Sequence, residues 1–174
     1  MFFLQMSGFP GSGKSTLSRE IAKRTEAIII DHDVSKTALL ETPAGAEMEN
    51  KTSGSISYHI DWSFIESMLS QGKKVIFDSP CLYDEIIVNG TDLAKKYQAK
   101  YKYVECYLND FNEINRRLKN RERKTSQIKE VNSLDDFNRT LENSKKPADH
   151  RYLVVDTSMG LDTYIDEVME YLEE

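Results

Sequence analysis

The stretch GFPGSGKST at residues 8–16 decides the fold expected for this chain. It satisfies the pattern G-x-x-x-x-G-K-[ST] in full. The apolar run Phe2–Met6 precedes it as a buried strand, and Ser15–Arg24 follows it with the spacing of a helix. A glycine-rich turn between a strand and a helix presents converging backbone N–H groups at the positive end of the helix dipole. The stretch therefore predicts a phosphate-binding loop.

Each residue type in this loop has a chemical reason. Glycines let the backbone approach phosphate oxygens without an intervening Cβ. Lys14 supplies a cation for the β- and γ-phosphates, the hydroxyl of Ser15 is a ligand for Mg²⁺, and Thr16 is placed to donate to the α-phosphate. ATP and Mg²⁺ are therefore the expected cofactors. The predicted nucleotide-binding residues of the loop are Gly8, Gly11, Ser12, Gly13, Lys14, Ser15 and Thr16.

Short apolar runs alternate with helical patterns along the rest of the chain. The further predicted strands are 27–30, 75–78, 103–108 and 152–156. The further predicted helices are 60–69, 84–97, 110–121, 134–143 and 164–172. Continuously apolar strands separated by helices are typical of an α/β protein whose parallel sheet is covered on both faces. Residues 41–57 show no period, and we expect either a mobile loop near the substrate or a linker without a role.

Length and composition bound the class of protein. A chain of 174 residues with 39% hydrophobic and 30% charged residues fits one folded domain. No basic, apolar leader or long apolar segment is present, so a cytoplasmic location without membrane attachment is expected. The two cysteines, Cys81 and Cys106, are far apart in sequence and form no metal-binding pattern. The net charge of −6 argues against a general nucleic-acid coating protein.

Carboxylates follow two of the predicted strands. Asp78 ends the apolar run 75–78 and is expected to hold Mg²⁺, directly or through water, together with Ser15. Asp31 and Asp33 follow the second strand, where a carboxylate can deprotonate an acceptor hydroxyl. Aspartate is also a favoured helix N-cap, so one of the two can cap while the other catalyses. The residues alone leave open which is the base.

Residues 116–129 contain seven of the 23 basic residues and one acid, Glu122. Arg117 and Arg121 are four positions apart and share one helix face, and Arg123 lies just beyond them. Guanidinium groups arriving from a lid neutralise the charge that develops on a transferring phosphoryl group. The alternative is a solvated helix face with scattered cations, which the near absence of acids disfavours.

These motifs together resemble the small P-loop kinases, among them the AAA_33 group, zeta-toxin-like kinases, polynucleotide kinase, and the gluconate, shikimate and adenylate kinases. The resemblance is carried by the loop at 8–16, by Asp33 with Lys36 three positions later, and by the R-x-x-x-R pattern at 117–121. It implies a three-layer P-loop NTPase fold with a five-stranded parallel sheet in the order 2-3-1-4-5. It also implies a single domain, 1–174, with an acceptor-side region at 32–72 and an arginine-rich lid segment at 117–133.

The same resemblance implies roles for individual residues. Lys14, Asp33 and Arg121 would be catalytic, with Asp33 as the general base and Arg121 as a phosphate contact. Arg117 would stack on adenine, and Thr157, with Ser158 beside it, would lie next to the base. Lys36 stands where the family usually has arginine, which disfavours a nucleic-acid 5′ end as the acceptor.

The expected activity is transfer of the γ-phosphoryl group of ATP to a hydroxyl of a small-molecule acceptor. No arginine lies between Arg24 and Arg116, which favours a neutral or sugar-like acceptor over a small carboxylate. The helix expected to face the acceptor opens with Tyr58, His59, Asp61 and Trp62, although Trp62 can equally pack in the core. The alternatives are an ATPase or nucleotide switch without a small acceptor, and a 5′-hydroxyl polynucleotide kinase. A monomer or a homodimer is expected.

Overall fold

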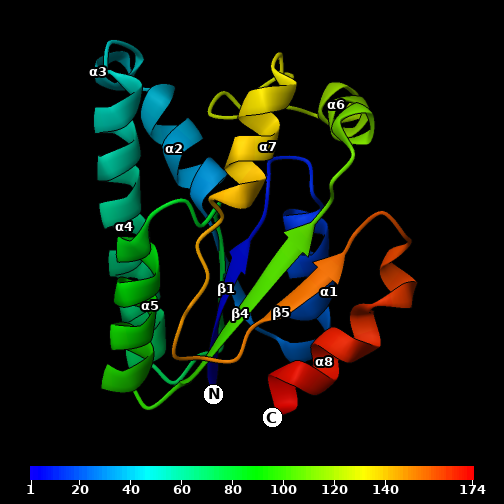
Figure 1. Cartoon of the computed structure of the whole chain (residues 1–174). Helices are drawn as coiled ribbons and strands as arrows, with labels where there is room; N and C mark the ends of the chain where they lie inside the picture. The colour runs from blue at the N-terminus through cyan, green and yellow to red at the C-terminus, as the bar shows by residue number, and fades with distance from the viewer.

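A computed structural model describes residues 1–174, and its centre is a five-stranded, all-parallel sheet. The strands lie in the order β2-β3-β1-β4-β5, which confirms the predicted fold class and strand order. Their carboxyl ends point to one edge, at the top of Figure 1, and both chain termini lie at the opposite edge. The bounds are β1 Phe2–Ser7, β2 Ile28–Asp31, β3 Val75–Asp78, β4 Lys100–Tyr107 and β5 Leu153–Asp156.

Helices cover both faces of this sheet (Figure 1). The helices α1 and α8 pack on one face and α4 and α5 on the other, while α2, α3, α6 and α7 lie beyond the carboxyl ends of the strands. The bounds are α1 Lys14–Thr25, α2 His32–Leu40, α3 Pro43–Ala46, α4 Asn50–Ser70, α5 Asp84–Lys96, α6 Phe111–Asn120, α7 Leu134–Glu142, the 3₁₀ turn η1 Leu161–Thr163, and α8 Ile165–Glu173.

The central strand β1 divides its side chains between the two cores. Leu4 and Met6 pack with α1 and α8, whereas Phe3 packs with α4 and α5. Successive side chains of a strand point to opposite faces, so a strand covered on both sides is apolar at nearly every position. A third cluster joins Phe9 of the phosphate-binding loop to Phe137 of α7, with ring centroids 4.9 Å apart. This contact fixes the loop beneath the elements that follow β4.

The prediction of a loop or linker at 41–57 is wrong, because these residues form α3 and the first turns of α4. The helix α4 does have a buried stripe at every fourth residue, but polar residues fill its first half. A serine or an aspartate at a buried position does not register as hydrophobic periodicity. The buried residues of this stripe are Ser53, Ser57, Asp61, Ile65 and Leu69.

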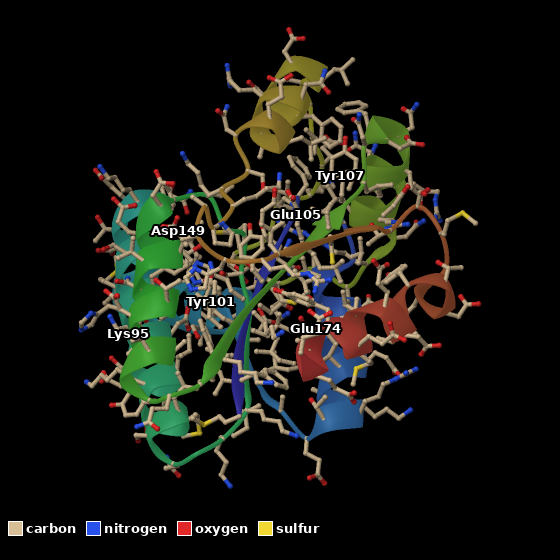
Figure 2. The ribbon with its side chains drawn as sticks, turned by 60° about the horizontal axis from the view of Figure 1, so that its bottom comes forward. Lys95, Tyr101, Glu105, Tyr107, Asp149 and Glu174 are labelled. Atoms are coloured by element: carbon tan, nitrogen blue, oxygen red, sulfur yellow. The ribbon has the colours of Figure 1, made fainter.

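A segment after α7, residues 143–151, crosses the face of β4 and was not expected from the sequence. Glu105 of β4 is buried and accepts from the hydroxyl of Ser144 at 2.6 Å and pairs with Lys146 at 2.9 Å. Figure 2 shows Tyr101, Glu105 and Tyr107 spaced along β4 and Asp149 in the covering segment. The segment thus closes the sheet face that α5 leaves open.

None of the helices combines the length and the apolar composition that a membrane crossing requires.

Two helical glycines give opposite predictions for stability. A Cβ at Gly54 of α4 would meet only Nζ of Lys36 at 3.8 Å, whereas a Cβ at Gly90 of α5 would lie 2.7 Å from Oε1 of Gln5 and 2.9 Å from the ring of Phe3. Gly54→Ala is expected to raise the free energy of unfolding by about 0.4–1 kcal/mol through the unfolded chain. Gly90→Ala is expected to lower it by about 1–3 kcal/mol through overpacking. Urea denaturation of both variants tests this, and equal effects would contradict the packing described here.

Candidate active site

One large cavity, of about 1760 Å³, opens at the carboxyl ends of the strands. Its walls come from the phosphate-binding loop, α2, α4, the end of β3, the start of α5, the lid segment and the turn after β5. Gly8 and Ser12 do not line it: Ser12 is buried behind the loop, and Gly8 lies against the backbone of β4. The other predicted site residues all line this cavity: Gly11, Gly13, Lys14, Ser15, Thr16, Asp33, Asp78, Arg117, Arg121 and Thr157.

The phosphate-binding loop has the backbone that an anion site needs. Gly13 is the N-cap of α1 with a φ of 97°, and no side chain caps the first amides of this helix. Uncapped N–H groups at a helix N-terminus are donors ready for a phosphate. At Gly8, φ is 128° and a Cβ would lie 2.2 Å from the carbonyl oxygen of Cys106, so only glycine fits. The loop is therefore held close to β4 with its amides facing the cavity.

Lys14 and Asp78 place opposite charges beside this loop. Nζ of Lys14 donates to the carbonyl oxygens of Gly8 at 2.8 Å and Phe9 at 3.2 Å. Burial lowers the pKa of Lys14, and the carboxylate of Asp78 opposes that shift. Burial raises the pKa of Asp78, against the attraction of Lys14 and a hydrogen bond from Ser15. A hydroxyl and a carboxylate side by side next to the phosphate cradle are oxygen ligands of the kind Mg²⁺ prefers.

The two aspartates after β2 have different surroundings. Asp31 caps α2 by accepting from the backbone N–H of Asp33 at 2.9 Å, and it pairs with Lys124 at 3.1 Å. The carboxylate of Asp33 accepts from the hydroxyl of Ser126 at 2.9 Å and from Nε2 of Gln127 at 2.8 Å. Asp31 thus has the capping position that the sequence allowed for either residue. Asp33 faces the cavity, with the lid segment held against it.

A buried His–Asp pair beside Asp33 was missed by sequence reasoning. Nδ1 of His32 lies 2.7 Å from Oδ2 of Asp61, which is fully buried and also accepts from the hydroxyl of Ser35. The ring of His32 stacks on Tyr58 with centroids 3.9 Å apart and 17° between the planes. Asp61 belongs to the polar half of the buried α4 stripe. A buried carboxylate needs partners, so that stripe is the one signal that could have indicated the pair.

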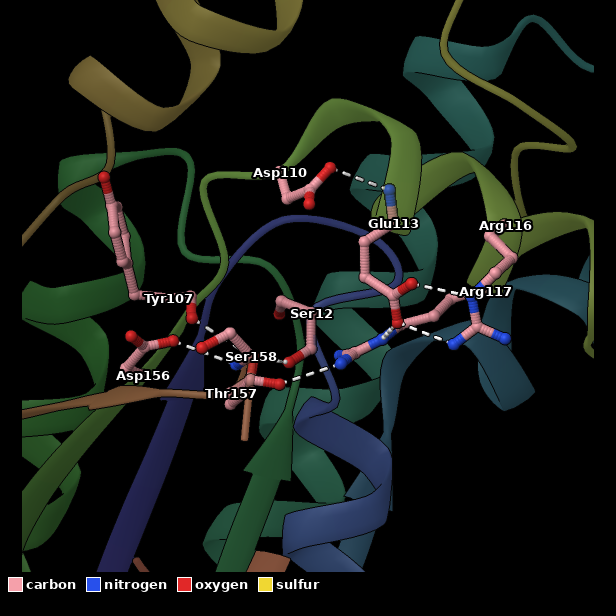
Figure 3. Close-up of polar contacts among 9 residues, drawn as sticks. All are labelled: Ser12, Tyr107, Asp110, Glu113, Arg116, Arg117, Asp156, Thr157 and Ser158. Atoms are coloured by element: carbon pink, nitrogen blue, oxygen red, sulfur yellow. Dashed lines mark hydrogen bonds and ion pairs between the residues drawn. The ribbon is translucent and has the colours of Figure 1, made fainter. Parts of the chain in front are cut away.

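Arg117 joins α6 to the loop after β5 (Figure 3). Its Nε donates to Glu113 at 2.7 Å and its Nη2 to the carbonyl oxygen of Thr157 at 2.8 Å. Thr157 is buried and donates through its hydroxyl to the carbonyl oxygen of Ser12 at 2.7 Å. The guanidinium of Arg117 therefore lies next to the phosphate-binding loop, with Nη1 4.0 Å from where a Cβ of Gly13 would be.

Arg121 follows α6 at the start of the irregular part of the lid segment. Its Nη2 donates to the carbonyl oxygen of Ile128 at 3.0 Å, while its Nε is buried without a partner. Burial lowers the pKa of Arg121, and the nearby carboxylate of Asp33 opposes this shift. Nη1 of Arg123 donates to the carbonyl oxygen of Gln127 at 3.1 Å. An arginine donor left unpaired at the wall of a cavity favours an anionic ligand there.

Several residues that line the cavity were missed by the sequence analysis. Met159, Leu161 and Tyr164 come from the stretch after β5. Asn50, Lys51 and Ser55 come from the start of α4, and Tyr83, Glu85 and Asn89 from the start of α5. The expected residues Tyr58, His59 and Trp62 also line it. Trp62 has both of the roles considered for it, because its ring also packs on Phe77 with centroids 4.9 Å apart.

Solved structures of two kinases and of Kti12 share this fold. A sugar kinase from a Janibacter species has a TM-score of 0.69 at 15% identity, with 99% of this chain and 95% of that chain covered. The kinase CysC of Mycobacterium tuberculosis, solved with AMPPNP and APS, has a TM-score of 0.64 at 14% identity, with 99% and 98% covered. Kti12 of Chaetomium thermophilum, solved with ADP-AlF₃, has a TM-score of 0.67 at 13% identity, with 98% of both chains covered.

No curated protein sequence matches the chain. The family model AAA_33, described as an AAA domain, matches residues 4–144. This range begins in β1 and ends just after α7, so it contains the phosphate-binding loop, both aspartates after β2 and the lid segment. With the strand order and the structural neighbours, it confirms the resemblance to small P-loop kinases. The chain belongs to the AAA_33 family of AAA-domain proteins.

Proposed function

We propose that the chain transfers the γ-phosphoryl group of ATP to a hydroxyl of a small-molecule acceptor. The observation that carries this proposal is the single cavity into which Lys14, Asp78 and Arg121 face from one side and Asp33 from α2. Phosphoryl transfer needs little more than positioned phosphates, positive charge around them and a base for the attacking hydroxyl. The kinases among the structural neighbours support the proposal at the level of the fold.

The residues present fit a magnesium ion. The hydroxyl of Ser15 and the carboxylate of Asp78 already contact each other, and Asp78 is buried beside the cationic Lys14. These two residues would hold Mg²⁺, with water completing its shell. When bound, Mg²⁺ neutralises negative charge on the β- and γ-phosphates.

The protein groups divide the remaining work. The amides at the start of α1 and Nζ of Lys14 bind the phosphates. Arg117 and Thr157 hold the adenine ring of the nucleotide. Arg121 supplies a donor to the transferring group from the lid segment. Asp33 accepts the proton of the acceptor hydroxyl and aligns its oxygen with the γ-phosphorus. The lid assignment at 117–133 and the acceptor-side region at 32–72 are part of this proposal, as is a monomer or homodimer.

A second candidate is an ATPase or nucleotide switch that has no small acceptor. The observation that favours it is the engagement of both carboxylate oxygens of Asp33 by Ser126 and Gln127 of the lid segment. One assay separates the two functions: ATP consumption is measured with and without a mixture of hydroxyl compounds, and the products are screened by mass spectrometry. Acceptor-dependent consumption with a phosphorylated product supports the kinase. Full-rate consumption without any acceptor supports the switch, and a phosphorylated 5′ end of an oligonucleotide identifies a polynucleotide kinase.

Alanine variants of Arg117 in α6 and Arg121 in the lid segment are expected to have different kinetic defects. Arg117→Ala is expected to raise the KM for ATP about 2- to 30-fold, as for a lost cation–π contact, and to weaken the preference for ATP over GTP. Arg121→Ala is expected to lower kcat about 10- to 100-fold, because its partner charge grows in the transition state. Steady-state kinetics with both nucleotides measures both effects. Identical defects in the two variants, or none, would show that the basic run is a solvated helix face.

A further inference from the structure

The His32–Asp61 pair presents one free polar atom to the cavity. A carboxylate can only accept, so Nδ1 of His32 carries the proton that faces Asp61. Nε2, on the opposite edge of the ring, has no partner in the protein, and the residue lines the cavity. Its orientation is over-determined by Asp61 on one edge and by Tyr58 on one ring face. In the neutral imidazole this arrangement fixes the tautomer, with Nε2 as a hydrogen-bond acceptor.

Nε2 of His32 and the carboxylate of Asp33 belong to neighbouring residues that line the same cavity. His32 and Asp33 are consecutive residues in the first turn of α2, and both line the same cavity. Consecutive helical residues point in directions about 100° apart, so they do not converge on one atom. They can contact two different groups of one small molecule instead. The second group must be a donor, as a hydroxyl is, because Nε2 accepts.

The surrounding wall has the composition of a site for a compact polar molecule with apolar faces. The side of α4 that faces the cavity presents Tyr58 and Trp62, and Tyr83 precedes α5 across from them. Aromatic faces bind the C–H surfaces of a ligand, while a few placed polar groups fix its orientation. The polar groups here include the amides of Asn50 and Asn89 and the hydroxyl of Ser55. No arginine of the acceptor half offers a planar fork to a carboxylate or phosphate.

We propose that Nε2 of His32, fixed by the buried carboxylate of Asp61, accepts a hydrogen bond from a second hydroxyl of the acceptor, so that the acceptor is a polyhydroxylated compound. This inference rests on the proposed kinase function and adds to it a residue that determines specificity. Asp61 and Ser35 act through His32 and are positioning residues.

The test combines matched acceptors with a matched variant. The probes are D-ribose and 2-deoxy-D-ribose, glycerol and 1-propanol, and myo-inositol and cyclohexanol, together with any compound of a metabolite extract that gains a phosphate. His32→Asn keeps a donor directed at Asp61 and removes the far edge of the ring, together with its stacking on Tyr58. Wild-type protein is expected to favour the member of a pair with more hydroxyls in kcat/KM by about tenfold or more, as for a lost hydrogen bond. His32→Asn is expected to raise the KM of that member about tenfold. It is expected to leave the KM of the member with fewer hydroxyls and the affinity for Mg-ATP unchanged.

The outcomes separate this inference from the proposed function. A His32→Asn protein that discriminates as wild type does would overturn the role of Nε2, and His32 would then only join α2 to α4. Equal use of both members of every pair by wild-type protein would overturn the inference without any variant. A phosphorylated product whose acceptor has only one hydroxyl would do the same while leaving the kinase intact. Binding of Mg-ATP without any phosphorylated product would contradict the kinase itself, and the inference with it.

Discussion

Replacing Asp33 by asparagine is expected to reduce phosphorylation of the acceptor by about 10²–10⁴-fold, the range for a lost general base. Asparagine keeps the shape of the side chain and one accepting oxygen. It removes the basicity, together with one of the two hydrogen bonds that Asp33 accepts from Ser126 and Gln127. The residue lies in the first turn of α2 and outside the phosphate-binding loop. The affinity for Mg-ATP, measured by calorimetry, is therefore expected to stay within about twofold of the wild-type value. Steady-state rates at saturating ATP give the loss directly.

Asp31→Asn is the matched control for this variant. Asp31 caps α2 and pairs with Lys124 at 3.1 Å, and asparagine is an equally good helix cap. Only the ion pair is lost, and a partly exposed pair contributes about 0–1 kcal/mol. The rate of phosphoryl transfer should thus change much less than for Asp33→Asn. Reversed behaviour of the two variants would assign the base to Asp31, and a loss of Mg-ATP binding in Asp33→Asn would place Asp33 in the metal site.

Removal of the Lys14 ammonium is expected to weaken the binding of Mg-ATP by about 2–5 kcal/mol, as for a charge deleted from a desolvated pair. In the free protein Lys14 donates to two carbonyl oxygens of its own loop, so the loop backbone also loses contacts in Lys14→Ala. Titration calorimetry measures the affinity, and a urea unfolding curve separates binding from folding.

Lys23→Ala is the control for charge alone, since Lys23 is an exposed lysine on the same helix. It is expected to leave the affinity for Mg-ATP unchanged. An unaltered dissociation constant in Lys14→Ala would rule out the nucleotide assignment of the loop.

The central strands were predictable because both faces of the sheet are covered, so each strand reads as a run of apolar residues. The start of β4 could not be predicted in this way, because it holds Lys100, Tyr101 and Lys102. Lys102 is buried there and donates from Nζ to the carbonyl oxygen of Tyr171 at 2.5 Å, while lying 4.4 Å from the centroid of the same residue's ring. A cation satisfied by a distant helix cannot be distinguished in sequence from a solvated one. Such a strand therefore looks shorter than it is.

Some parts of the site depend on residues close in sequence, and other parts depend on contacts between distant residues. The phosphate-binding loop depends on neighbours in sequence, so its spacing alone predicts the turn between β1 and α1. Lys14 and Ser15 of this turn line the cavity. The partners of Asp33 come from residues more than ninety positions away, and those of His32 from the packing of α2 on α4. No local pattern encodes such contacts, because each side chain involved is an ordinary polar residue in its own stretch of sequence.

The docking of the lid segment on α2 has a consequence for how acceptor concentration is sensed. Thr37 accepts from the backbone of Ser126, and Glu41 accepts from Thr125, so the segment is also held at points that touch neither proposed ligand. An acceptor that needs Asp33 competes with Ser126 and Gln127. Its apparent dissociation constant is the intrinsic one divided by the fraction of molecules in which the segment has moved away. By thermodynamic reciprocity, a bound acceptor favours the released segment to the same extent. Under the proposed kinase function, the lid segment would thus be an internal competitor of the acceptor. Thr37 and Glu41 would then help set how much acceptor is needed to displace it.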